Sequence, residues 1–68
     1  MNDYTYKIDV MTDDGEAYEF EGAVQGKEFL EAFLLVHKIM MDKIYALPDR
    51  SVREKIRMEG PDVPEDYR

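Results

Sequence analysis

Cysteine is absent from the 68 residues of this chain. Disulfides, thiolate catalysis and cysteine-ligated metal sites are therefore excluded. Long apolar runs are also missing, since the longest, Ala32–Val36, is far shorter than the roughly 20 residues that span a membrane. The first 15 residues carry four aspartates. We therefore expect no secretory signal peptide, no membrane contact and a cytoplasmic location.

Groups that perform catalysis are scarce. His37 is the only histidine and Ser51 the only serine, and no phosphate-binding loop is present. A chain of this length also has little room for a substrate pocket of roughly 300 Å³ or more. We expect no enzymatic activity, no catalytic residue, no cofactor and no metal site. His37 is expected to be a half-buried packing residue.

Basic residues are few, with 9 Lys and Arg against 16 Asp and Glu, and the net charge is −7. Residues 1–22 alone carry −6, whereas residues 48–58 carry +2. Contacts to phosphate require cations, so direct binding to nucleic acid is not expected. The hydrophobic share of 44% is too high for a wholly disordered chain, and the length allows one small domain.

Alternating apolar residues predict two strands, at about residues 4–12 and 16–22. A loop of three residues, Asp13-Asp14-Gly15, would pair Val10 with Tyr18. A loop of two residues would instead pair Val10 with Glu19, on the same face of the sheet. The sequence therefore predicts an antiparallel hairpin with the longer loop, in which Gly15 takes the left-handed conformation.

The predicted register gathers acidic side chains on the outer face of the hairpin. Asp9 falls opposite Glu19, and Lys7 falls opposite Glu21. Opposed like charges destabilise a strand pair, so we infer that the acidic patch binds a protein partner with a basic surface. The alternative is a solvated face without a partner. The candidate partner-binding residues are Asp9, Asp13, Glu16, Glu19 and Glu21.

A helix is predicted from Lys27 to about Ala46, because this stretch contains neither glycine nor proline and Pro48 follows it. One broad apolar arc should cover the hairpin. The residues of the arc are Phe29, Leu30, Phe33, Leu34, Val36, His37, Met40, Met41, Ile44 and Leu47. A second, narrow stripe falls outside it and consists of Ala32, Leu35 and Ile39. We predict a homodimer with this stripe as its interface. The alternative is coverage by the C-terminal segment of the same chain.

Residues 49–59 fit two structures. A short second helix is favoured, because Glu, Lys, Arg and Met prefer helix. The alternative is a third strand, because Val52, Glu54, Ile56 and Met58 alternate with three bases. Residues 61–68 contain two prolines and are expected to form a flexible acidic tail, or alternatively a docking peptide anchored by Val63 and Tyr67.

The expected fold is α+β. An N-terminal antiparallel hairpin packs on one long amphipathic helix, and a short second helix or third strand and a flexible tail follow. Residues 1–60 should form the single domain, and residues 61–68 the tail.

These features predict a small non-enzymatic protein–protein interaction module, homodimeric, that acts as an inhibitor or adaptor by occluding a partner surface. The alternative is an acidic nucleic-acid mimic that blocks a DNA- or RNA-binding protein. In size and acidity the chain is similar to small phage-encoded inhibitors of that kind, such as inhibitors of uracil-DNA glycosylase or of CRISPR nucleases. The similarity is one of composition, without a shared motif.

Overall fold

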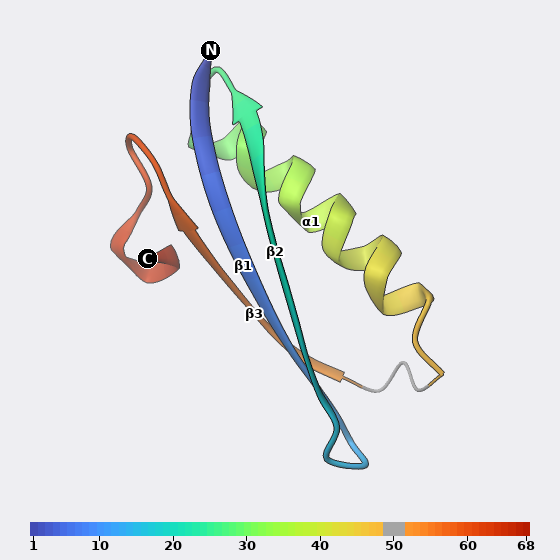
Figure 1. Ribbon diagram of the computed structural model, residues 1–68. Coiled ribbons are helices and arrows are strands. Elements are labelled where there is room, and N and C mark those ends of the chain that lie inside the picture. The colour runs from blue at the N-terminus through green and yellow to red at the C-terminus, as the bar shows by residue number, and fades with distance from the viewer. Residues whose placement is uncertain (49–51) are drawn as a thin grey trace.

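The computed structural model describes residues 1–48 and 52–68 of the chain. Three antiparallel strands form one sheet in the order β2-β1-β3, and a single helix packs on it (Figure 1). The predicted α+β class is confirmed. The elements are β1 (Asn2–Thr12), β2 (Ala17–Gly26), α1 (Phe29–Tyr45), β3 (Val52–Glu59) and a 3₁₀ turn, η1 (Glu65–Tyr67).

The hairpin has the predicted register, with Val10 paired to Tyr18 and Asp9 to Glu19. In the loop, Gly15 has a φ of +90°, the left-handed conformation that the loop was expected to require. The loop is closed by the backbone N–H of Thr12, which donates to the carbonyl oxygen of Glu16 at 2.8 Å. Matching the apolar faces of two strands was therefore sufficient to identify both the turn and the pairing.

β2 runs four residues beyond its predicted end, because residues 22–26 pair with residues 2–6 of β1. Gly22 lies opposite Tyr6 in this extension. A Cβ atom on Gly22 would lie 2.5 Å from the Tyr6 hydroxyl oxygen. The glycine, which suggested a connection in the sequence, instead allows the tyrosine ring to lie close to the neighbouring strand.

α1 begins and ends within two residues of its predicted bounds, but it is rotated about its axis from the expected orientation. Leu30 and Leu34 are 58% and 60% exposed, so the prediction that the hairpin covers them is wrong. Ala32 is instead fully buried, because its small side chain lets the helix start approach Gly26 closely. The buried residues of the helix are Ala32, Val36, Met40 and Ile44.

Residues 52–59 form a strand, so the favoured second helix is wrong here and the strand alternative is confirmed. Residues 49–51 of that prediction lie outside the described residues. β3 pairs with β1 along its length, with Val52 opposite Thr12 at one end and Glu59 opposite Thr5 at the other. The pairing buries Met58, and this tertiary gain outweighs the weak helix preference of the charged residues around it.

The C-terminal residues pack against the domain. Val63 is 2% exposed, and the ring centroid of Tyr67 lies 5.0 Å from that of Phe33 and 5.5 Å from that of Phe29. These contacts hold Val63 and Tyr67 against the domain in this structure. Rings at this spacing stabilise each other beyond the area that they bury.

Asp62 connects this C-terminal segment to β1 and α1. Its carboxylate accepts hydrogen bonds from the Tyr4 hydroxyl at 2.8 Å and from the backbone N–H of Phe29 at 3.1 Å. Burial and the hydrogen bond to Asp62 raise the pKa of Tyr4. The side chain of Glu28, the N-cap residue, makes no capping hydrogen bond to the helix. Asp62 therefore supplies, from a distant position in the sequence, the acceptor that the first turn of the helix needs.

We expect Asp62→Ala to lower the free energy of unfolding by about 1–2 kcal/mol, because α1 loses its N-terminal acceptor. Asp62→Asn should lose less, because asparagine keeps an acceptor oxygen and tolerates the left-handed φ of 55° at this position. Urea denaturation would measure both changes. Asp66→Ala, at an exposed position in the same segment, is the control. Equal stability of the Asp62→Ala and Asp66→Ala variants would contradict the assignment.

Gly15→Ala should destabilise the fold by about 1 kcal/mol, because alanine resists positive φ. Gly15→Asn should cost less, since asparagine adopts this conformation more readily. Thermal unfolding monitored by circular dichroism would rank the three proteins. If the alanine variant were as stable as the parent chain, the loop conformation would be wrong.

Candidate interaction surfaces

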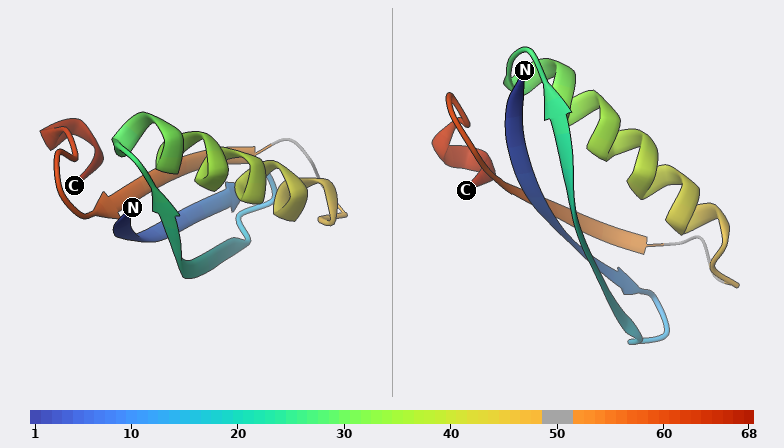
Figure 2. Two further views of the ribbon diagram at one scale, coloured as in Figure 1. Left: turned by 90° about the horizontal axis from the view of Figure 1, so that it is seen from above. Right: turned by 45° about the horizontal axis from the view of Figure 1, so that its top comes forward.

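One face of the sheet is open, because α1 packs on the other (Figure 2). Charged side chains cover this open face in three parallel rows, one for each strand. The row on the β2 edge is acidic, the central row is mixed, and the row on the β3 edge is basic. In that order the rows contain Glu19 and Glu21; Lys7 and Asp9; and Arg53, Lys55 and Arg57.

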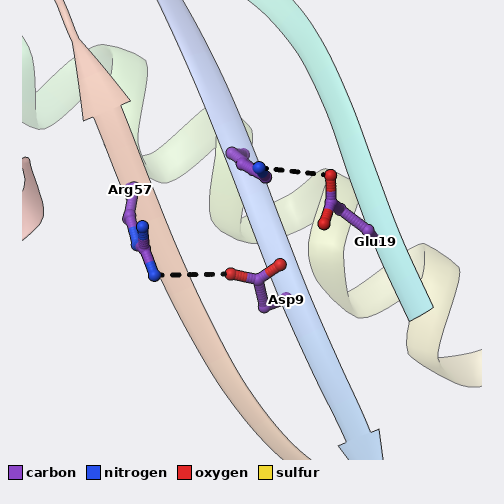
Figure 3. A network of polar contacts seen from close by, with 4 residues as sticks. Asp9, Glu19 and Arg57 are labelled. Atoms are coloured by element: carbon purple, nitrogen blue, oxygen red, sulfur yellow. Dashed lines mark ion pairs between the residues drawn. The ribbon is translucent and has the colours of Figure 1, made fainter. Parts of the chain in front are cut away.

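Ion pairs cross the rows diagonally (Figure 3). The Lys7 Nζ atom lies 3.2 Å from Oε1 of Glu19, and the Arg57 Nη2 atom lies 3.8 Å from Oδ2 of Asp9. The Lys7 ammonium holds the pKa of Glu19 below its usual value. The repulsion that the sequence suggested between Asp9 and Glu19 is therefore relieved within the chain. Asp9 and Glu19 lie together as predicted, but on a face that also carries bases.

Two other candidate residues, Asp13 and Glu16, lie in the hairpin loop, which projects beyond the helix (Figure 1). Both are exposed. Glu16 accepts a hydrogen bond from the Tyr18 hydroxyl at 2.6 Å, which raises the pKa of Tyr18. Asp14 accepts hydrogen bonds from the Thr12 hydroxyl and the Glu16 N–H, and both lower its pKa. The lowered pKa keeps the Asp14 carboxylate ionised at neutral pH.

The five candidate residues consequently divide into two groups. Asp9, Glu19 and Glu21 belong to the mixed open face, whereas Asp13 and Glu16 belong to the projecting loop. Sequence reasoning missed the three bases of β3, since it favoured a helix there. The alternation of apolar residues with Arg53, Lys55 and Arg57 was the signal that could have placed them.

The outward side of α1 carries exposed leucines. Leu35 is 43% exposed, in addition to Leu30 and Leu34. Of the other two predicted interface residues, Ile39 is half-buried and Ala32 lies in the core of its own chain. Ala32 offers no surface to a second chain, which corrects its assignment. His37 is exposed rather than half-buried, with its ring centroid 6.3 Å from that of Phe33.

A shallow hollow of about 780 Å³ lies beside the open face. Its charged lining residues are Lys7, Glu21, Arg57, Glu59 and Arg68. His37 is not among its described lining residues.

No family model, curated protein or solved structure matches this chain. Within residues 1–48 and 52–68, no helix is long and apolar enough to cross a membrane. The same residues contain no group of three or more histidine, aspartate or glutamate side chains suited to holding a metal ion.

The ion pair between Lys7 and Glu19 predicts an acid-dependent contribution to stability. Because the pKa of Glu19 is lowered in the folded chain, this contribution is present above its unfolded pKa of 4.5 and is lost as the pH falls through the folded value. We expect Glu19→Gln to be less stable than the parent chain at pH 7. The difference should shrink below pH 4.5, as Glu19 takes up a proton first in the unfolded chain and then, at lower pH, in the folded chain. Urea denaturation across this pH range would measure it, and a difference independent of pH would contradict the ion pair.

Proposed function

We propose that this chain is a non-enzymatic protein–protein interaction module that acts as a homodimer. The observation that carries this proposal is the exposure of Leu30, Leu34 and Leu35, on the side of α1 that the sheet leaves uncovered. A domain of this size buries a smaller share of its surface than a large domain does, so pairing two such helices would add stability that one chain lacks. The module then acts as an inhibitor or adaptor by covering part of a partner protein.

A second copy of the chain is the occupant that the charges of α1 favour. In a two-fold dimer with antiparallel helices, an axis between Leu34 and Leu35 sets those two leucines of one copy against their counterparts in the other. The flanking charges are also complementary, since Lys27 meets Asp42 and Glu31 meets Lys38 of the second copy. One symmetry axis thus matches both the apolar and the charged positions.

The acidic loop supports a role in partner binding. Asp13 and Glu16 project at one end of an elongated molecule, whose principal extents are 38 × 20 × 15 Å. We propose that this loop meets a basic surface of a partner protein. The alternative of a nucleic-acid mimic has less support, because a mimic needs an extended array of carboxylates and the open face alternates acids with bases. Rows of mixed charge do not imitate a phosphate backbone.

The dimer is tested by exchanging charges across the proposed axis. Asp42→Lys should weaken self-association about tenfold, because two contacts with Lys27 of the second copy change from attractive to repulsive. Adding Lys27→Glu should restore it. The double exchange also places an acid near the start of α1 and a base near its end, which favours the helix.

Sedimentation equilibrium over a range of concentrations measures these associations. Asp66→Lys makes the same change in net charge at an exposed position outside α1, and it should leave self-association unchanged. A particle of 8.0 kDa at high micromolar concentration would contradict the homodimer. So would a double variant that remained as weak as the single one.

A further inference from the structure

The outer edge of β3 is unpaired. β1 lies on one side of β3, and within residues 1–48 and 52–68 no strand lies on the other (Figure 1). The direction of the backbone groups follows from the hairpin, where the Thr12 N–H points toward β2. The backbone N–H and C=O groups of successive residues point to alternate sides of a strand. Those of the odd-numbered residues of β1 therefore point toward β3, where these residues pair with Arg53, Lys55 and Arg57. The backbone groups of Glu54 and Ile56 therefore point to the free edge.

The two faces of this edge differ in chemistry. On the open face, Arg53 and Lys55 are exposed, and neither forms an ion pair with another described residue. Arg57 is engaged only in its 3.8 Å contact with Asp9. On the face toward the helix, Val52 and Ile56 are half-buried, since α1 packs on β2 and β1. Glu54, opposite Val10, lies between Val52 and Ile56 on this face and is exposed. An added strand would thus find cations on one face and, apart from Glu54, apolar side chains on the other.

We propose that the β3 edge binds an extended segment of a partner protein in which acidic and apolar residues alternate. The segment joins the sheet as a fourth, antiparallel strand. Its backbone pairs with Glu54 and Ile56, its carboxylates face Arg53 and Lys55, and its apolar side chains cover Ile56. This inference names a partner chemistry for the module but rests on β3 alone. It stands independently of the dimer through α1.

The charges of β3 disfavour a second copy of this chain as the occupant. Symmetric pairing of two β3 edges would set Arg53, Lys55 and Arg57 against the same three bases. The β2 edge, with Glu19 and Glu21, has the matching charge, but pairing β2 to β3 of the next copy is a head-to-tail contact, which gives a ring or an open chain of subunits. A charged edge also protects a lone sheet against such growth. An acidic segment of another protein satisfies the cations without either consequence.

Two fluorescein-labelled peptides of about eight residues serve as probes, a length typical of one strand. One alternates glutamate with valine, and the other replaces every glutamate by lysine. In fluorescence anisotropy titrations at low salt, the acidic peptide should bind at least tenfold more tightly than the basic one. Equal binding of the two peptides, or no binding of the acidic one, would overturn the proposal and leave the bases as edge protection only.

Variants at Glu54 separate strand addition from simple charge attraction. Glu54→Pro removes the N–H at the free edge without removing a hydrogen bond to β1, and proline is tolerated at such positions. It should weaken binding of the acidic peptide at least tenfold relative to Glu54→Ala, while circular dichroism confirms that both variants fold. Equal binding by the two variants would overturn strand addition.

Lys55→Glu should weaken binding of the acidic peptide in the same assay. The Asp42→Lys variant, changed only on α1, should bind it like the parent chain, so failure of the dimer and failure of the β3 site are distinguishable. If the parent chain alone grew into long assemblies that Glu19→Lys abolished, the β3 edge would belong to a second copy. That outcome would also overturn the proposal.

Discussion

β1 has a paired strand on each side, and the alternation of its side chains determines both faces of the sheet. Tyr4, Ile8 and Val10 point toward α1 and are at most 2% exposed. Because β2 and β3 are each in register with β1, their large apolar residues follow onto the same face and their charges onto the other, except for Glu54, which lies opposite Val10. A shift of either pairing by one residue would bury a row of charges. The core and the open face are thus two consequences of one constraint.

The hairpin was predictable because its evidence is local. Val10, Tyr18 and Phe20 must share a face, and only the loop of three residues allows this. β3 was less predictable, because the strand with which it pairs, β1, lies some 40 or more positions earlier in the chain. Thr12 pairs with Val52, and Thr5 pairs with Glu59. Helix preference is a property of each residue alone, whereas the strand depends on a surface that other segments build. The alternating pattern of β3 was visible in the sequence, but the sequence did not indicate which strand would pair with it.

The orientation of α1 and the composition of the open face show the same limit. A hydrophobic arc indicates which residues can be buried, but the sheet covers only part of it, and Leu30 and Leu34 remain outside. Alanine is weakly hydrophobic, yet Ala32 is buried because close approach near Gly26 selects a small side chain. The acidic residues of the hairpin were identified correctly as neighbours. The bases that flank them come from β3, so the mixed character of the face depends on the element that the sequence assigned wrongly.

The contacts of Asp62 and of β3 also indicate the order in which the parts of the chain fold. The hairpin and α1 join residues that are near in sequence, whereas β3 pairing and the contacts of Asp62 with Tyr4 and Phe29 close loops of 33 to 58 residues. Long loops cost more entropy before their contacts form, so local elements assemble first and the C-terminal segment docks late. Interactions that form after the transition state act mainly on the unfolding rate. The Asp62 carboxylate thus stabilises the finished fold without guiding its formation.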